Sequence, residues 1–180
     1  MSTFKVTNSK ISNAFDNACC VLRSVSKEFV VPTIVSVRIS NASSYWGKIG
    51  RVSGGGFKLS ISREFERILD VDLAKRRLEE CLIHELIHTM PGRMNHGPKF
   101  KQICYLVNNK YKGKYNIQTC TSCEDYGEVI ERKEKPNKYE IVCPHCNRKY
   151  YYKRLPKYDI SRYNCACGKD GLMIKTIVGV

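Results

Sequence analysis

The sequence lacks the features that mark membrane, secreted and nucleotide-binding proteins. It contains no apolar run approaching the ~20 residues that span a bilayer, and its first residues include no apolar stretch of a secretory signal. We therefore expect neither a membrane span nor a signal peptide. Neither a GxGxxG nor a GxxxxGKS/T pattern occurs, which argues against a dinucleotide site and a P-loop site.

Acidic residues are also scarce. The 180 residues include 31 lysines and arginines against 17 aspartates and glutamates, which gives a formal net charge of +14. A surplus of this size favours a polyanion as partner, most simply nucleic acid, with an anionic membrane surface second. Between Leu86 and Cys123 six residues are basic and none is acidic, so positive charge gathers in one part of the chain.

Apolar residues recur at helical spacing in three segments and follow strand patterns in three shorter ones. We predict helices over about 9–29, 72–90 and 98–113, and strands over 33–40, 45–49 and 57–61. The first strand is rich in β-branched residues and alternates, which predicts one buried face. The expected fold class is α+β, with helices packed on a small antiparallel sheet.

The composition changes after Tyr115. Residues 119–138 are polar and mixed in charge, which indicates a linker or a peripheral hairpin. Residues 139–180 are rich in cysteine, tyrosine and basic residues, and this unit is too small to bury a core without a metal. We expect the main domain to span residues 1–118.

The segment His84-Glu85-Leu86-Ile87-His88 is an HExxH motif inside the second predicted helix. Residues four apart lie on one helical face, so both imidazoles can reach a single ion. Zinc accepts imidazole nitrogen in tetrahedral geometry. Glu85 would stand beside the ion as the general base that activates the attacking water.

A catalytic zinc needs a third protein ligand, and His96 is the natural candidate. It follows a Pro-Gly break, so the chain can turn back towards the metal. A carboxylate ligand on a following helix is disfavoured, because no Asp or Glu occurs between Glu85 and Glu124. The longer HExxHxxGxxH pattern also fails, since Pro91 and Met94 occupy its Gly and His positions. The alternative is that His96 is a loop or helix-cap residue.

Two close cysteine pairs, eighteen residues apart, have the spacing of a zinc ribbon. The predicted ligands are Cys143, Cys146, Cys165 and Cys167. A third pair, Cys120 and Cys123, could replace the C-terminal pair. We favour the C-terminal pair because Gly168 and the apolar residues 172–174 fit the closing strand of a ribbon.

Basic residues interleave with tyrosines in this C-terminal unit. The predicted nucleic-acid contacts are Arg148, Lys149, Tyr151, Lys153, Arg154, Lys157 and Arg162. Cations beside aromatic platforms suit single-stranded or distorted nucleic acid. The alternative is a basic but non-binding surface whose tyrosines pack a thin β unit.

The stretch HELIHTMPGRMNHGPKF, residues 84–100, resembles the SprT-like (Spartan-type) zinc metalloprotease family, with its HExxH helix followed by His-Gly and a helix with Phe. Upstream, Tyr45-Trp46-Gly47-Lys48 and the strand at 57–62 are similar to the strand region of that family. The resemblance implies a C-terminal zinc ribbon and a cytosolic or nuclear protease of proteins attached to DNA. The single residue between Cys165 and Cys167 departs from the usual spacing of two.

We therefore expect a zinc-dependent metalloprotease that cleaves proteins bound or crosslinked to DNA, with one catalytic and one structural zinc ion. The expected partners are single-stranded or distorted DNA and DNA-bound proteins, with the chain acting as a monomer in the cytoplasm, nucleoid or nucleus. Two alternatives stay open: a non-enzymatic nucleic-acid-binding protein with a structural His site, and a zinc hydrolase of a non-peptide substrate. Tyr105, Tyr111 and Arg93 are candidates for stabilising the oxyanion.

Overall fold

The computed structural model describes residues 3–119, 127–131, 136–155, 157 and 159–176. It divides the chain into two compact units, Met1–Glu131 and Arg132–Val180. The first contains three α-helices and a three-stranded sheet, and the second contains another three-stranded sheet. The predicted α+β class is therefore confirmed. Across the described residues, every helix is too short or too polar to cross a bilayer.

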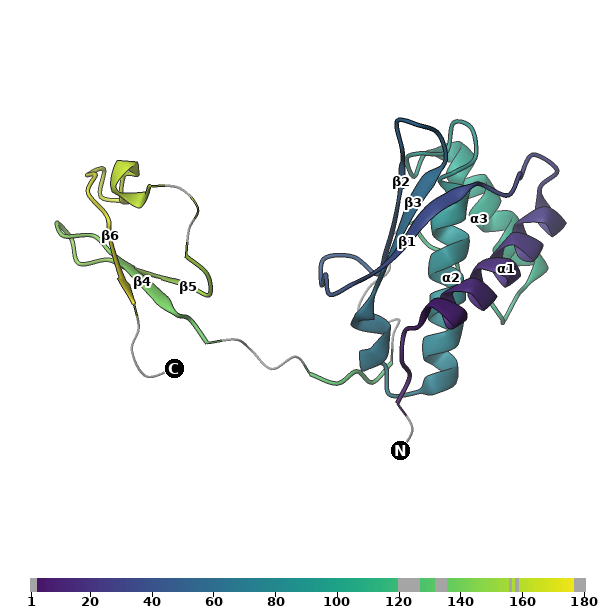
Figure 1. Ribbon diagram of the computed structural model, residues 1–180, viewed down its shortest axis with the longest axis horizontal. Coiled ribbons are helices and arrows are strands. Elements are labelled where there is room, and N and C mark those ends of the chain that lie inside the picture. Colours follow the sequence, from purple (N-terminus) through teal and green to yellow (C-terminus); the bar gives the residue numbers. More distant parts are fainter. Residues whose placement is uncertain (1–2, 120–126, 132–135, 156, 158, 177–180) are drawn as a thin grey trace. The chain divides into compact units, whose positions relative to one another are not determined.

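The sheet of the first unit has the strand order β1-β3-β2 (Figure 1). Its strands are β1 (Ile34–Ser40), β2 (Gly47–Arg51) and β3 (Phe57–Ser62). β2 and β3 form the expected antiparallel hairpin, but β1 runs parallel to β3, so the prediction of a purely antiparallel sheet was wrong. The connection between β1 and β2 carries the chain past the place that β3 later fills, and β3 then runs in the direction of β1.

Strand β1 does not have the buried face that its alternation predicts. Val35 and Val37 are 50% and 46% exposed, and only Ser40 of this strand is buried. The strand lies at an edge of the sheet, and only its two ends reach the core, where Ile34 and Ile39 are half-buried.

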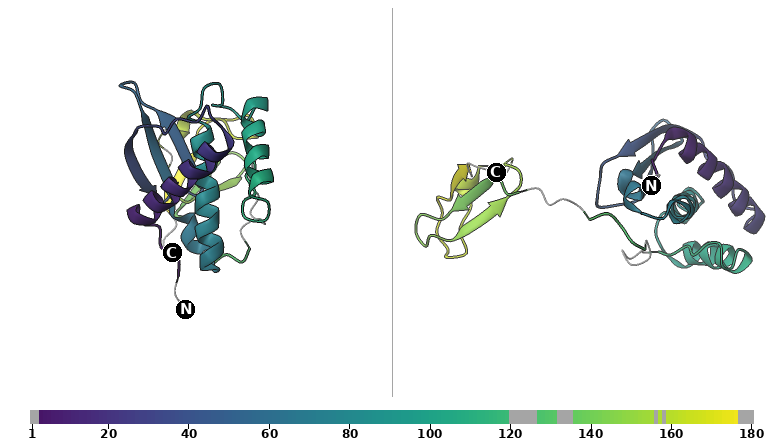
Figure 2. Two further views of the ribbon diagram at one scale, coloured as in Figure 1. Left: turned by 90° about the vertical axis from the view of Figure 1, so that its right-hand side faces the viewer. Right: turned by 90° about the horizontal axis from the view of Figure 1, so that it is seen from below.

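The three helices lie on one face of this sheet (Figures 1 and 2). They are α1 (Asn8–Val25), α2 (Val71–Ile87) and α3 (Pro98–Lys110). The central helix α2 packs against α1, α3 and β2, and its Leu78, Leu82 and Ile83 are almost completely buried. The start of α2 is capped by Asp70, whose carboxylate accepts from the backbone N–H groups of the first turn.

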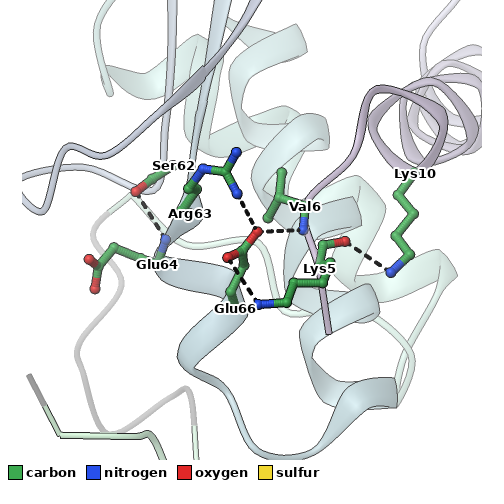
Figure 3. Close-up of polar contacts among 7 residues, drawn as sticks. All are labelled: Lys5, Val6, Lys10, Ser62, Arg63, Glu64 and Glu66. Carbon is green, nitrogen blue, oxygen red and sulfur yellow. Dashed lines mark hydrogen bonds and ion pairs between the residues drawn. The ribbon is translucent and has the colours of Figure 1, made fainter. Parts of the chain in front are cut away.

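The N-terminal segment before α1 is tied to the first unit by a single carboxylate (Figure 3). Glu66 lies in the short helix η1 (Arg63–Arg67), and its Oε1 accepts from the Val6 N–H at 3.0 Å and from the Arg63 guanidinium at 2.9 Å. Phe4 and Val6 are buried beside it. This segment therefore closes one end of the core.

Helix α2 ends at Ile87, three residues before the predicted end. The Leu86 carbonyl accepts both the Thr89 N–H at 3.0 Å and the Thr89 hydroxyl at 2.7 Å, which tightens the chain into a turn. The early end matters for the site, because it lets the chain reverse direction and return His96 to the helix end.

The second unit is an antiparallel sheet of order β5-β4-β6. Its elements are β4 (Tyr139–Val142), β5 (Lys149–Tyr152), the short helix η3 (Ile160–Arg162) and β6 (Met173–Thr176). The strand expected after Gly168 is present as β6. Ile141, Val142 and Ile160 are the buried aliphatic residues that the structure describes here, so the apolar interior is small.

Of residues 119–138 the structure describes 119, 127–131 and 136–138, and the segment 127–131 belongs to the first unit. Leu69 N–H donates to the Glu128 carbonyl at 3.1 Å and Ile130 N–H to the Arg67 carbonyl at 2.8 Å. Cys120 and Cys123, the alternative ligand pair, lie outside the described residues.

Candidate functional site

Three histidines converge at the C-terminal end of α2. His84 lies in the last turn of the helix, His88 is its C-cap and His96 comes from the loop before α3. Their Nε2 atoms lie 3.2 Å apart between His84 and His88, 3.0 Å between His84 and His96, and 3.2 Å between His88 and His96. The structure thus brings His96 to the HExxH pair, and the group could hold a metal ion.

Hydrogen bonds determine which nitrogen carries the proton in two of these rings. The Nδ1 of His84 lies 2.8 Å from the Gln118 carbonyl, and the Nδ1 of His88 lies 2.8 Å from the Arg93 carbonyl. A carbonyl can only accept, so each Nδ1 carries the proton and each Nε2 of a neutral ring presents a lone pair. Burial lowers the pKa of His84 to about 4 and also lowers that of His88, which favours the neutral rings.

This arrangement fits zinc. Two lone pairs 3.2 Å apart repel each other unless a cation lies between them. Nitrogen ligands of a tetrahedral zinc with bonds of about 2.0–2.1 Å lie about 3.3 Å apart, close to the three observed spacings. Three imidazoles leave a fourth position open, which is typical of catalytic rather than structural zinc.

Glu85 lies beside the histidines and is held by strand β2. Its side chain is 8% exposed, and its Oε2 accepts from the Ile49 N–H at 2.8 Å. Burial raises the pKa of Glu85 to about 7, although the Ile49 N–H opposes that shift. A carboxylate whose pKa lies near neutrality is suited to accept a proton and release it again.

The approach of β2 to α2 depends on a glycine. A Cβ on Gly47 would overlap the Cys81 Sγ and lie 3.1 Å from the Glu85 Cγ. The absence of a side chain here lets β2 lie close enough for the Ile49 N–H to reach the carboxylate. Burial raises the pKa of Cys81, which keeps this neighbour a neutral thiol.

The chain after α3 is fixed where it meets His84. The side chain of Asn108 hydrogen-bonds both backbone groups of Ile117. Its Nδ2 donates to the Ile117 carbonyl at 3.0 Å, and its Oδ1 accepts from the Ile117 N–H at 2.7 Å. The next carbonyl, that of Gln118, accepts from His84. Asn108 therefore holds the group that orients one candidate ligand, as outer hydrogen bonds do around bound metals.

Two carboxylates of α2 hold the same segment from the other side. Glu79 accepts the Tyr115 hydroxyl at 2.7 Å, and Glu80 accepts the Asn116 N–H at 2.9 Å. Glu80 also pairs with Arg77 at 2.6 Å. These contacts fix residues 115–116 against the helix that carries the histidines.

The backbone carbonyl of Arg93 orients the ring of His88. Its buried guanidinium donates to the Pro91 carbonyl at 2.9 Å and pairs with Glu28 at 2.7 Å. This fixes the turn whose carbonyl accepts from His88. The Arg93 side chain is thus engaged away from the histidines.

A cleft of about 350 Å³ opens at the candidate site. One wall is formed by residues 44–47 and the other by residues 116–119, with His84, Glu85 and His96 between them. Tyr105, Tyr111 and Arg93, the candidates for oxyanion stabilisation, are not among its lining residues. Gly47 is the residue of β2 that lines this cleft, and further along the strand the Ile49 N–H is taken by Glu85.

The second ligand cluster joins two turns of the second unit. Cys143 and Cys167 have their sulfurs 3.7 Å apart, and Cys146 and Cys165 have theirs 3.5 Å apart. A tetrahedral zinc with Zn–S bonds of about 2.3 Å separates its sulfurs by about 3.8 Å. The four cysteines are free thiols that could hold one metal ion, and His145 is exposed and outside the cluster.

Each turn is closed by a residue in the left-handed region. Asn147 has φ 55° after the first pair, and Gly168 has φ 82° after the second. The Gly168 N–H donates back to the Cys165 carbonyl at 2.8 Å, which accommodates the shorter spacing of that pair. The Tyr150 hydroxyl lies 3.4 Å from the Cys165 sulfur, and this hydrogen bond is the main cause that lowers the pKa of Cys165.

The predicted nucleic-acid residues fall into two groups. Lys149 pairs with Glu140 at 2.8 Å, and Arg162 pairs with Asp159 at 3.2 Å, so these charges are partly offset. The others, namely Arg148, Tyr151, Lys153, Arg154 and Lys157, are exposed. Within the described part of the chain the four cations of this group have no carboxylate partner.

The tyrosines of β5 face both ways. Tyr151 is 54% exposed and pairs across the sheet with Glu140, while Tyr150 and Tyr152 line a cavity of about 200 Å³ together with Ile160. Tyr150 and Tyr152 therefore face the small interior, although Tyr152 is still 37% exposed, and Tyr151 lies on the other face as the most exposed of the three.

Sequence reasoning missed the residues that orient the histidines and Glu85. Asn108, Gln118 and Ile49 act through backbone contacts between segments far apart in the chain, and no local spacing marks them. The glycine at position 47 was noted only as part of a resemblance.

Comparison of the chain with protein-family models, with curated proteins and with solved structures finds no match.

Proposed function

We infer that the chain is a zinc-dependent metalloprotease of the SprT-like kind that acts on proteins bound or crosslinked to DNA. The observation that carries the inference is the convergence of three imidazole Nε2 atoms within 3.0–3.2 Å, beside Glu85 and inside one cleft. Three ligands with an open fourth position favour a reactive centre over a structural one. His84, His88 and His96 would hold the ion.

Zinc held by these rings would supply Lewis acidity, which polarises a carbonyl and makes water a nucleophile near neutral pH. The residues of the chain have separate tasks around it. Glu85 takes the proton of the attacking water and passes it to the leaving amine, because its pKa is raised towards neutrality. Gln118 and Arg93 hold the rings of His84 and His88 in one tautomer through their carbonyls.

The cleft suits an extended chain as substrate. Its walls are the segments 44–47 and 116–119, and a peptide laid between them would pass His84, Glu85 and His96. A folded domain cannot present its backbone in this way without local unfolding. Substrates are therefore loops, termini or partly unfolded proteins.

The second unit provides the surface that we propose binds nucleic acid. With zinc in its four cysteines it is a zinc ribbon, and its exposed cations Lys153, Arg154 and Lys157 and the ring of Tyr151 suit single-stranded or distorted DNA. DNA bound there raises the effective concentration of any protein attached to the same DNA. This is the reason for proposing DNA-held proteins as substrates.

The test compares two copies of one substrate protein, one coupled to single-stranded DNA and the other free. We expect the zinc-loaded chain to cleave the coupled copy faster, with a chelator abolishing both reactions, as measured by mass spectrometry of the fragments. Equal cleavage of both copies would remove DNA from the function. An absence of fragments in every condition would favour the non-enzymatic alternative.

A further inference from the structure

A second cavity of the first unit has a cluster of cations along its walls. It has a volume of about 400 Å³ and lies between α2 and the chain that leaves α3. Four of its lining residues are basic, namely Arg76, Arg77, Lys112 and Lys114. One acidic residue, Glu80, lines it as well. No step of the proposed proteolysis uses this cavity.

The single carboxylate does not neutralise the cluster. Glu80 is engaged by Arg77 at 2.6 Å and by the Asn116 N–H at 2.9 Å. Lys114 lies over the Tyr115 ring, with its Nζ 4.7 Å from the ring centroid. The side chains of Arg76 and Lys112 are exposed, and neither forms a hydrogen bond or ion pair with a described residue. Three cations around one cavity therefore lack an acidic partner.

Cations gathered around a concave surface repel each other and raise the local concentration of anions. Guanidinium groups match the oxygen geometry of phosphate with two parallel hydrogen bonds, and lysines add point charges. The cavity is lined mostly by charged and polar residues and is open at the surface, and its volume lies within the ~300–1,000 Å³ of ligand sites. Phosphate is the chemical group that this combination of residues fits best.

The cavity adjoins the cleft of the candidate active site. Glu80 and Asn116 line both spaces, and they are joined by a hydrogen bond of 2.9 Å. The pair of Glu80 and Asn116 would therefore lie between a phosphate in the basic cavity and the cleft. Both spaces belong to the first unit, so this proximity does not involve the second unit.

We propose that this basic cavity binds a backbone phosphate of nucleic acid and so guides the strand past the catalytic cleft. The proposal deepens the proposed function, on which its choice of nucleic acid rests. It gives the first unit a phosphate site of its own. A protein attached to the strand is then presented beside the cleft, whatever the second unit contacts.

The test removes two charges that support no contact of the fold. The variant Arg76→Gln with Lys112→Gln is compared with Lys58→Gln with Lys101→Gln, a pair of exposed lysines outside the cavity. Each full-length, zinc-loaded chain is titrated with single-stranded oligonucleotide at several salt concentrations. A phosphate contact adds about 0.7 to the slope of log Kobs against log salt for single strands. Because the cavity holds one phosphate, we expect the slope of the cavity variant to fall by about 0.7 and that of the control to stay unchanged.

Melting temperature and zinc content verify that both variants are folded. If the double variant does not fold, Lys112→Gln alone, which lies beyond the end of α3, carries the test with a loss of up to about 0.7 in slope. Equal slopes for the cavity variant and the wild type would overturn the proposal. Binding is measured without cleavage, so a chain that never cuts a protein still tests the cavity.

Competition with inorganic phosphate tests whether the cavity binds a phosphate of nucleic acid or a free phosphate compound. Added at constant ionic strength, it should compete weakly with the oligonucleotide on the wild type and not on the cavity variant. If phosphate instead raises the melting temperature of the wild type alone while both chains bind the oligonucleotide with equal slopes, the site belongs to a free phosphate compound. That result would overturn the assignment to nucleic acid.

Discussion

The three-histidine cluster is built on a helix inside a large apolar core, whereas the four-cysteine cluster joins two turns of a unit with almost no core of its own. Helix α2 buries Leu78, Leu82 and Ile83 around the histidines. In the second unit the buried aliphatic residues among those described are Ile141, Val142 and Ile160. We therefore propose that the first unit folds without metal and that the second unit needs metal to fold.

The number of ligands follows the same division. Four cysteines close the coordination of an ion and leave no position for substrate, which suits a structural role. Three histidines leave one position open towards a cleft that also contains Glu85. From this comparison we infer two separable uses of metal in this chain, each of which can be removed without the other.

The largest effect is expected from removing two thiolates. Cys143→Ser with Cys146→Ser should lose one of two zinc ions and unfold the second unit only, because structural zinc contributes about 10–16 kcal/mol to such units. Elemental analysis and hydrogen exchange resolved by segment measure both effects. One zinc ion in the wild type would contradict the comparison.

The same assay checks the ligand pair. Cys165→Ser should lose the same ion, and Cys120→Ser should keep it. The reverse result would transfer the site to Cys120 and Cys123.

A glycine is expected to matter next. Gly47→Ala introduces a Cβ that overlaps the Cys81 Sγ, so β2 must move away from α2 and from Glu85. Overpacking of this kind costs about 1–3 kcal/mol, and cleavage should fall as well. Gly50→Ala is the matched control in the same strand, because nothing lies within 4 Å of its added Cβ. Equal thermal unfolding of the two variants would show that the close approach of β2 is not needed.

The orientation of His84 predicts a smaller effect, on affinity. Asn108→Ala releases the Ile117 backbone and loosens the Gln118 carbonyl that accepts from His84. Loss of such a supporting contact lowers metal affinity about 10-fold or more. Competition with a zinc chelator measures it at the first site. Asn109→Ala, at the exposed neighbouring position, should bind zinc as the wild type does.

The smallest effect concerns the surface of the second unit. Lys153→Gln, Arg154→Gln and Lys157→Gln together should lower the salt slope for single-stranded DNA by about 2, at about 0.7 per contact. Lys149→Gln with Arg162→Gln is the comparison, since Glu140 and Asp159 already offset these charges. A larger change in the second variant would reverse the assignment of the contacts.

Local features of the first unit were predictable from the sequence. The Asp70 cap, Pro98 as the first residue of α3 and the HExxH pair on one helical face follow from backbone geometry over a few residues. His96 was predicted from the Pro-Gly break, and the structure places it at the helix end.

Features that depend on distant pairing were not predictable. The parallel pairing of β1 and the contact between Ile49 and Glu85 join segments whose spacing carries no periodic signal. The tyrosines of β5 alternate between faces as in any strand, but which face turns inward depends on the register of that strand. The sequence located the residues of the site, and the tertiary structure supplied what orients them.

The most direct test of the account is the cleavage rate of a DNA-coupled protein substrate by the wild type and by Glu85→Gln, at equal zinc content. The substitution keeps the shape of the side chain and removes its ability to accept a proton. A general base contributes about 10²–10⁴-fold to such a rate, so we predict a loss of that order with two zinc ions still bound. Full turnover by the variant would contradict the account, because the three-histidine site would then not be working through Glu85.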